Sequence, residues 1–489
     1  MRHIVMSSCL ALCACDGGIL SVLPLERAPV KGPGGGVVPG ATSVDPSATP
    51  IRRLSAVEYQ RSLARLFPGA MLPVVTLPAD TKPHGFDNDA AANGPSALLV
   101  DAWLQAAQDV SASVTRAGAP YTCAANNAAC PEQKLRDVLR RAWRRPPTDE
   151  DVADFMTIGA TGPASTDARA RVQLLLEAVL LTPDFLYRFD VPAVDPGDAP
   201  SATIDAYSLA SRLSYLVTAA GPDDELLDAA RDGKLDTDEG LQAELERLLA
   251  QPESRDGVLH FFRQWFEVER LETVRKLEAD GFDATMRASL AESFDRYVES
   301  IVFDGQGGTV NDLLTQPYAF VDATTAPIYG LTGTSEWQRV QLDPLKRAGV
   351  LTQPLFLSTH AHPGNPSPVL RGVFVLEKVL CQRVGSPPAA AQGVAITATG
   401  PGPSTNRSRY EATTTAGTCG GCHSTFINPP GYAFEHYDTL GRRLELDGAQ
   451  PIDASGTLLD FHFTDGLDFS KQLGASAMVR RCVTERFAR

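Results

Sequence analysis

The sequence is short of positive charge and of cysteine. Its 489 residues carry 44 lysines and arginines against 59 aspartates and glutamates, which gives a net charge of −15. Because an acidic chain repels phosphate backbones, nucleic acid is not expected among its partners. Nine cysteines over this length are too few for a fold built on disulfides. Their uneven placement is nevertheless the main source of information about function.

Apolar residues, by contrast, are plentiful. Hydrophobic residues make up 43% of the chain and charged residues 21%, a balance typical of globular proteins rather than disordered ones. At about 150 residues per domain, the length allows roughly three domains. The chain is therefore expected to bury several hydrophobic cores.

The first fifteen residues combine a charged start with a short apolar segment. They are too few to supply the roughly 18 apolar residues that a membrane-spanning helix needs. The run Leu12-Cys13-Ala14-Cys15 is similar to a bacterial lipoprotein cleavage box. Residues 1–15 are therefore predicted to be a signal peptide with this lipobox, and Cys15 to be the lipidated residue. A plain signal peptide or a misassigned start codon are the alternatives.

The next segment, residues 16–50, is rich in glycine and proline and cannot form a core. Such a composition predicts a flexible tether. Signal, lipid and tether together predict localisation at the cell envelope, with a lipid anchor in the membrane and the folded part in the periplasm or on the outer surface.

Residues 51–340 are predicted to form a helical body of several consecutive subdomains. Ser55 and Glu58 have capping-box spacing at the start of an amphipathic run. No repeat of fixed period is present, so an irregular mainly α assembly is expected rather than a solenoid. Further helices are predicted at about 96–116, 132–144, 149–157, 167–182, 204–218, 238–250, 254–270 and 285–303.

Residues 341–489 have a different character and are predicted to form a separate, smaller domain. Helical stretches at 344–358 and 369–382 precede a linker at 385–408 that is rich in Ala, Pro, Gly and Thr. A short β segment with a turn at Asp447-Gly448 and a terminal helix at 470–487 follow.

Two pairs of cysteines are predicted to form disulfides. Cys123 and Cys130 enclose a short loop, and an exported protein folds in an oxidising compartment. A metal site is the alternative there, but no histidine or third cysteine is near in sequence. Cys381 and Cys482 are expected to pair and to fasten the terminal helix to the helix at 369–382.

The pentapeptide Cys419-Gly-Gly-Cys422-His423 is the attachment signature of c-type haem. Two thiols this far apart can add to the two haem vinyl groups, and the adjacent histidine can bind the iron. The sequence thus predicts one covalent haem c with its iron on His423. A thioredoxin-type redox pair and half of a zinc site are the alternatives; the first lacks the alternating strands and helices of that fold, and the second lacks another ligand pair.

Further expectations concern the surroundings of the haem. Pro429 and Pro430 are hypothesised to fix a turn whose backbone carbonyl accepts a hydrogen bond from His423 Nδ1. His362 and Met478 are the preferred candidates for a sixth iron ligand, although Met478 also fits a core position. An open distal position is equally allowed. The remaining histidine candidates are His360, His436 and His462, and the carboxylates Glu435, Asp438, Asp453 and Asp460 are expected to lie in solvated turns.

Several longer motifs resemble a family of secreted proteins abundant in planctomycetes and myxobacteria. Its members are built from consecutive domains of unknown function and end in a planctomycete-type cytochrome-c-like domain. The resemblance covers about residues 52 to 489 and implies a mostly helical exported protein with one haem on Cys419, Cys422 and His423, but no established substrate. It is carried by Arg53-Leu-Ser-Ala-Val-Glu-Tyr59, Gly85-Phe-Asp-Asn88, Arg141-Ala-Trp-Arg-Arg-Pro146, Thr182-Pro-Asp-Phe-Leu-Tyr-Arg188, Leu209-Ala-Ser-Arg-Leu-Ser-Tyr215, Pro222-Asp-Asp-Glu-Leu-Leu227, Arg347-Ala-Gly-Val-Leu-Thr-Gln353, Ser367-Pro-Val-Leu-Arg-Gly372 and Gly431-Tyr-Ala-Phe-Glu435.

These observations predict an exported, lipid-anchored, monohaem c-type cytochrome-like protein that passes single electrons to an unknown redox partner. No catalytic side chain is assigned, because iron can change its oxidation state without a protein acid or base. A haem oxidoreductase of the peroxidase or oxygenase kind, and a surface binding protein with a structural haem, are the alternatives.

Overall fold

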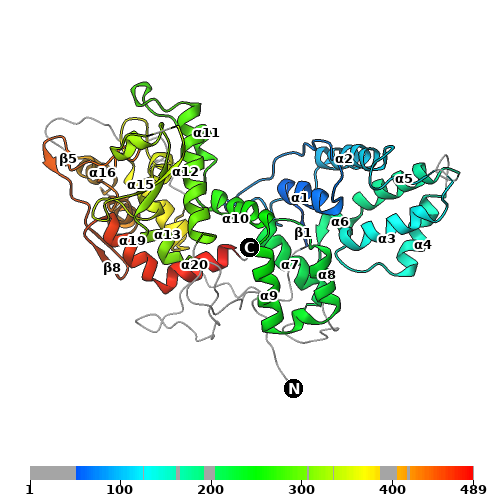
Figure 1. The fold of residues 1–489 in the computed structure, drawn as a ribbon. Coiled ribbons are helices and arrows are strands. Elements are labelled where there is room, and N and C mark those ends of the chain that lie inside the picture. The colour runs from blue at the N-terminus through cyan, green and yellow to red at the C-terminus, as the bar shows by residue number, and fades with distance from the viewer. Residues whose placement is uncertain are drawn as a thin grey trace, which may run out of the picture. The chain divides into compact units, whose positions relative to one another are not determined.

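The computed structural model describes residues 51–124, 126–160, 166–191, 204–304, 308–333, 335–385, 405–415 and 419–487 (Figure 1). The predicted signal segment with Cys15, the tether at 16–50 and most of the linker at 385–408 lie outside these residues. The described residues fall into two compact units, an N-terminal unit of residues 51–258 and a C-terminal unit of residues 259–487. The mainly α fold class is confirmed.

The N-terminal unit is helical apart from one short antiparallel pair, β1 (Arg52–Arg53) with β2 (Tyr187–Arg188). Serine, threonine or aspartate caps most of its helices, which is why the predicted starts agree with the observed ones to within about two residues. Its elements are α1 (Ala56–Leu66), α2 (Ala97–Thr115), α3 (Cys130–Ala142), α4 (Asp149–Ile158), α5 (Ala168–Leu180), α6 (Pro183–Leu186), α7 (Ala206–Thr218), α8 (Asp224–Arg231), η2 (Lys234–Asp236), α9 (Asp238–Leu249) and the first half of α10 (Pro252–Trp265).

One hydrophobic core of the N-terminal unit lies around α2, α3 and α5, where α5 packs against both other helices (Figure 1). A second, smaller one joins α7, α8, η2 and α9. A buried arginine, Arg144, fastens the first core to the segment after α5. Its guanidinium donates hydrogen bonds to the Tyr215 hydroxyl and to three main-chain carbonyls, those of Asp184, Phe185 and Tyr187. The backbone of Arg144 is left-handed, with φ of 59°.

The C-terminal unit combines helices of one or two turns with longer ones of nine to nineteen residues and with three antiparallel strand pairs. Its elements are α11 (Arg270–Thr273), η3 (Glu278–Asp280), α12 (Ala284–Val302), α13 (Val310–Thr315), β3 (Tyr318–Val321), η4 (Ala326–Tyr329), β4 (Gln338–Gln341), η5 (Val350–Thr352), α14 (Pro354–Thr359), α15 (Pro368–Phe374), η6 (Val375–Val379), α16 (Asn406–Thr414), α17 (Gly420–Cys422), η9 (His423–Ile427), α18 (Asn428–Tyr432), β5 (Leu446–Asp447), β6 (Gln450–Pro451), β7 (Gly456–Leu458), β8 (Phe461–Phe463), α19 (Gly466–Ala475) and α20 (Ala477–Phe487).

Three details of this unit differ from the sequence-based expectation. The antiparallel pair β3–β4 was not anticipated. The terminal helix is interrupted at Ser476, which adopts extended backbone angles and separates α19 from α20. The expected boundary near residue 340 lies inside the unit, because α12 packs on β3, α13 and α14 and so joins both sides of that position.

No helix within the described residues is long and apolar enough to cross a membrane.

Candidate functional site

The Cys-x-x-Cys-His segment lies on a single turn of α-helix that continues as a π-helical turn. Cys419 caps the N-terminus of α17 and Cys422 is its last residue, so the two thiols are one helical turn apart. Both are exposed free thiols, whereas the other cysteines within the described residues form disulfides. The segment therefore presents two reactive groups to solvent at the spacing that two vinyl groups require.

His423 opens the π-helical turn η9, and its ring is held by one side chain. Nδ1 lies 2.9 Å from Oδ1 of Asn428. Asn428 is fully buried, and its Nδ2 donates to Thr414 Oγ1 at 2.8 Å and to the Tyr432 hydroxyl at 3.1 Å. Within the described residues, the other ring nitrogen of His423, Nε2, has no hydrogen-bond partner. Nε2 is thus left available for a metal.

This contact corrects the hypothesis that a backbone carbonyl near Pro429 and Pro430 holds the ring. The physical reason is the π-helical winding, in which a residue lies over the fifth residue along rather than the fourth. Asn428 is the fifth residue after His423, so its side chain arrives beside the imidazole. Pro429 and Pro430 are instead buried in the first turn of α18.

The glycines between the cysteines have two different roles. A Cβ at Gly420 would lie 2.4 Å from the carbonyl oxygen of Thr415, so only glycine fits there. A Cβ at Gly421 would have no neighbouring atom within 4 Å. The thiols, the available Nε2 and the open space at Gly421 are together compatible with a porphyrin bound against this turn.

Helix α15 supports the segment by an unusually close approach. A Cβ at Gly372 on α15 would lie 1.9 Å from the carbonyl oxygen of Ile427 in η9, and a Cβ at Gly431 on α18 would lie 1.8 Å from the carbonyl oxygen of Pro368 in α15. Any side chain at either position would push the two helices apart. These glycines fix the backbone of η9 and α18 against a rigid neighbour.

Arg371, also on α15, extends this support. The side chain is fully buried and its guanidinium donates to four carbonyl oxygens at 2.8–3.1 Å. Within the described residues, its Nε has no partner. The four carbonyls belong to Leu357 of α14 and to Phe434, Tyr437 and Asp438, which directly follow α18. Arg371 thereby holds the segment after α18 in place against α14 and α15.

Glu435 departs from the expected solvated turn, because it is buried, with 5% of its surface exposed. Asn406 Nδ2 donates to both of its carboxylate oxygens, at 2.9 and 3.1 Å. Burial raises the pKa of Glu435 to about 7, against the opposing effects of the Asn406 hydrogen bond and of the Arg371 charge. Asp438 and Asp453 do lie in turns, where they accept hydrogen bonds from backbone amides, and Asp460 is exposed.

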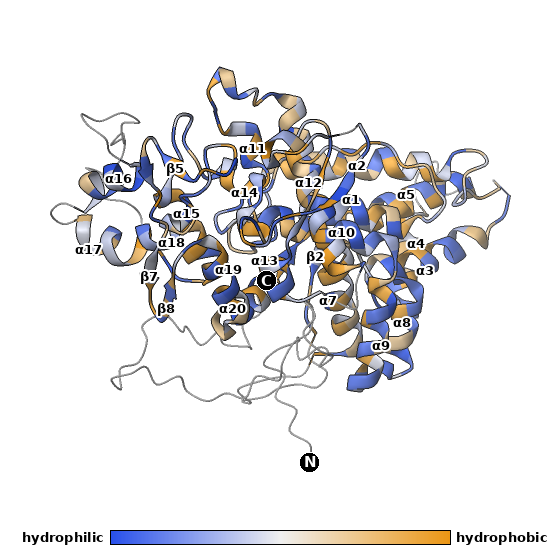
Figure 2. Cartoon of the chain, turned by 60° about the vertical axis from the view of Figure 1, so that its left-hand side comes forward, coloured by the Kyte–Doolittle hydropathy of each residue, from blue (hydrophilic) through white to orange (hydrophobic). Residues whose placement is uncertain are grey.

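The candidate sixth ligands lie in different places. His362 is exposed in the loop after α14, and its backbone amide donates to Asn365. Met478 lies at the start of α20, where its sulfur accepts from Gln382 at 3.8 Å. Figure 2 shows α17 next to α16 and α18, and α20 below α19. His360 is buried with Nε2 3.6 Å from Glu267, and the Nδ1 atoms of His436 and His462 lie 2.9 Å from the Leu444 carbonyl and 3.2 Å from the Thr457 hydroxyl.

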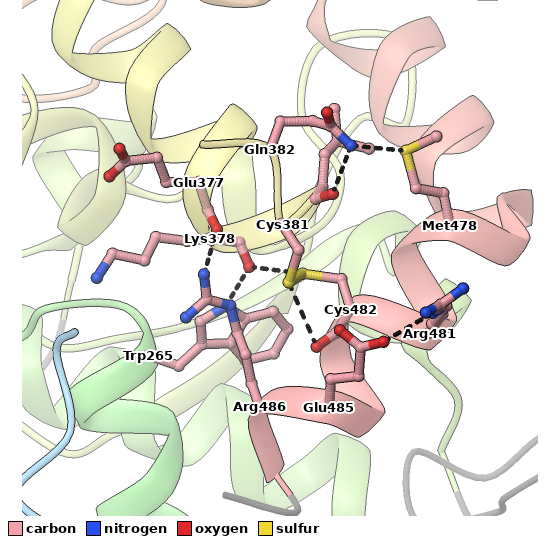
Figure 3. The surroundings of a disulfide bond; sticks show 11 residues. Trp265, Glu377, Lys378, Cys381, Gln382, Met478, Arg481, Cys482, Glu485 and Arg486 are labelled. Carbon is pink, nitrogen blue, oxygen red and sulfur yellow. Dashed lines mark hydrogen bonds and ion pairs between the residues drawn. A yellow bond between two sulfur atoms is a disulfide. The ribbon is translucent and has the colours of Figure 1, made fainter. Parts of the chain in front are cut away.

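Both predicted disulfides are confirmed, Cys123–Cys130 and Cys381–Cys482. Figure 3 shows that the second one fastens α20 to the end of η6. The indole of Trp265 donates to the Lys378 carbonyl at 2.9 Å beside it, and Arg486 donates to the Glu377 carbonyl. The disulfide therefore belongs to a structural junction rather than to the site.

Sequence reasoning missed the residues that support the site. The sequence analysis assigned no role to Asn428, Arg371, Gly372 or Asn406. Arg371 and Gly372 do lie in a motif that carries the family resemblance, which was the one available signal. Apart from Leu357, the partners of Arg371 and Gly372 lie more than 50 residues away in sequence, beyond the reach of local pattern reasoning.

Four models of protein families match this mainly α chain, each described as a protein of unknown function. They are DUF1587 (PSD3) over residues 52–116, DUF1595 (PSD5) over 130–190, DUF1592 (PSD4) over 204–331 and DUF1588 (PSCyt3) over 347–446. PSCyt3 is a planctomycete cytochrome-like domain, and its match contains Cys419, Cys422 and His423. Together the four matches support a planctomycete-type multi-domain family of unknown function.

No curated protein and no solved structure matches the chain significantly.

Proposed function

We propose that this protein is a monohaem c-type cytochrome of the cell envelope, which binds haem c through Cys419 and Cys422 and its iron through His423. The observation that carries the proposal is the combination of two exposed free thiols, one helical turn apart, with an adjacent imidazole whose Nε2 is available. The match to a cytochrome-like domain over the same residues adds to it.

In this proposal the haem supplies one-electron chemistry at its iron. The protein's part is to attach the haem, to orient the histidine ligand and to limit access to the iron. Cys419 and Cys422 fix the ring covalently, Asn428 orients His423, and the contacts of Gly372 and Gly431 keep the segment from moving. A rigid mounting favours electron transfer, because the iron changes its charge without a rearrangement of its protein ligand.

The experiment that tests the proposal is covalent haem attachment. The full chain is produced in a bacterial host that carries a c-type haem maturation system, and haem is measured by pyridine haemochrome and by haem staining of denaturing gels. One haem per chain is expected. The C419A/C422A variant is expected to lose it, whereas the matched control C123S/C130S, which alters a disulfide far from the motif in sequence, is expected to keep it.

The outcomes separate the alternatives. Absence of covalent haem from the native chain, or zinc on the two thiols instead, overturns the proposal. Low-spin iron that does not react with peroxide supports electron transfer. High-spin iron that turns over peroxide overturns electron transfer in favour of a haem oxidoreductase.

Export and lipidation at Cys15 complete the proposal and have their own test. Metabolic labelling with a radioactive fatty acid is expected to label the native chain and not the C15S variant. Unlabelled native chain in a host that lipidates a reference lipoprotein overturns the anchor, and leaves the haem result unaffected.

A further inference from the structure

We infer that Asn428 is a positioning residue that sets the tautomer and the electron donation of His423. The inference rests on the proposed function only for its consequence at the iron. The tautomer itself is a property of the protein without haem.

The geometry fixes which end of the Asn428 amide faces the imidazole. Thr414 Oγ1 donates its single proton to the carbonyl oxygen of Tyr410 at 2.6 Å. Toward Asn428, 2.8 Å away, this hydroxyl can therefore only accept. The amide atom facing Thr414 must be the nitrogen, so the oxygen faces His423.

The amide oxygen can only accept a hydrogen bond, which requires a proton on Nδ1 of His423 at 2.9 Å. In neutral imidazole the other nitrogen then carries the lone pair. Nε2 is therefore unprotonated and able to bind a metal ion even in the metal-free protein. Because Asn428 is fully buried and Nδ2 has two partners, the amide has little freedom to turn round.

The strength of this hydrogen bond also sets how strongly His423 donates electrons to a bound iron. A neutral amide oxygen polarises the ring less than a carboxylate does and more than an apolar neighbour does. Asn428 should therefore hold the iron at an intermediate reduction potential. N428D should shift the midpoint potential down, and N428L should shift it up, relative to the native chain.

The decisive measurement is made on the full chain without haem. Nitrogen-15 NMR of the labelled histidine side chains, with H423Q used to assign His423, is expected to find Nδ1 protonated in the native chain. N428L is expected to release the ring to the Nε2-protonated form that free histidine favours. T414V removes the acceptor that fixes the amide, and is expected to give a mixture of the two tautomers.

The matched control is T413V, on the same helix. Thr413 is exposed and donates to the Arg409 carbonyl, so its loss should leave the tautomer unchanged. Nε2–H in the native chain, or an Nδ1–H form that persists in N428L, overturns the inference. If N428L does not fold, T414V decides, because an unchanged Nδ1–H form in that variant overturns the inference.

The haem-loaded protein gives the second readout. The expected order of midpoint potentials is N428L above native above N428D. Equal potentials overturn the role of Asn428 at the iron. A chain that takes up no haem overturns the proposed function instead, and the tautomer result then stands by itself.

Discussion

Each of the two compact units contains a buried arginine, but the two arginines stabilise different parts of the molecule. In each unit the guanidinium donates hydrogen bonds to several main-chain carbonyls. Within the described residues, neither Arg144 nor Arg371 forms an ion pair with a carboxylate. Arg144 also lies over the ring of Tyr215, with its guanidinium carbon 5.4 Å from the ring centroid, and fastens the core of its own unit. Arg371 has carbonyl partners alone, and three of the four follow the Cys-x-x-Cys-His segment. The same device therefore stabilises a scaffold in one unit and the candidate site in the other.

The disulfides show the same contrast. Cys123 and Cys130 are seven residues apart, whereas Cys381 and Cys482 are 101 residues apart. The longer loop loses more conformational freedom in the unfolded chain when it is closed. The second disulfide also encloses the entire Cys-x-x-Cys-His segment, so it constrains the part of the chain that carries the candidate site.

The largest expected effect is therefore removal of the long-range disulfide. C381S/C482S should destabilise residues 259–487 by about 4 to 5 kcal/mol, from loop-closure entropy. Hydrogen exchange by mass spectrometry measures this, because it follows peptides of each unit separately. Residues 51–258 should keep their native protection from exchange. An equal loss of protection in both units would show that the disulfide does not act on the C-terminal unit alone.

The second effect compares the two arginines directly. R371M removes the guanidinium donor of four carbonyls, of which those of Phe434 and Asp438 still accept from the amides of Tyr437 and Gly441. The substitution should cost roughly 3 to 4 kcal/mol, within residues 259–487 only. R144M should cost a similar amount, within residues 51–258 only. The two exchange patterns should be mutually exclusive. If R144M loosens the Cys-x-x-Cys-His segment as much as R371M does, the two arginines do not act within separate units.

The local features of this fold could be predicted from the sequence, and the long-range ones could not. Caps such as Ser55 with Glu58 gave the start of α1, and the short spacing of Cys123 and Cys130 gave their disulfide. The pair Cys381–Cys482 is the long-range exception, since both cysteines flank the Cys-x-x-Cys-His segment in sequence. Helix caps and short disulfide loops involve residues that are close in sequence, so the sequence pattern predicts them. The pair β3–β4 was missed because the two strands are short and separated by an irregular segment.

At the candidate site, the sequence identified the groups that would hold haem but not what orients them. Arg371 binds carbonyls, and every residue has one, so its partners carry no signature in the sequence. Glu435 looked solvated because glutamate usually is. Its carboxylate is held by Asn406, which is 29 residues away and at the end of the predicted linker.

The third effect is a dependence of folding stability on pH that is confined to the C-terminal unit. The pKa of Glu435 is raised by burial from 4.5 to about 7, so the folded state keeps a proton that the unfolded state releases. Stability contributed by this group is full below pH 4.5 and is lost as the pH rises to about 7, by an amount on the order of 3 kcal/mol. Arg371, Arg407 and Asp447 are the charged groups that face it.

E435Q mimics the protonated acid and should remove this decline. Hydrogen exchange of residues 259–487 at pH 5 and pH 8 should therefore differ in the native chain and agree more closely in the variant. E411Q is a suitable control, because Glu411 lies on α16 near the same segment but is partly exposed in an ion pair with Arg407. A native chain whose C-terminal unit gains stability between pH 5 and 8 would contradict the buried, protonated state.

The smallest effect concerns the short loop of the N-terminal unit. C123S/C130S opens a loop of seven residues and should cost about 2 to 3 kcal/mol, less than the long-range disulfide because a short loop has fewer unfolded conformations to lose. The loss should appear in peptides of α2 and α3 and not in those of α17 and η9. Covalent haem content should not change, since no part of the candidate site depends on this loop. If the two double variants cost the same, loop closure is not the source of their stabilisation, and packing at the buried sulfurs of Cys123, Cys130 and Cys482 must supply it instead.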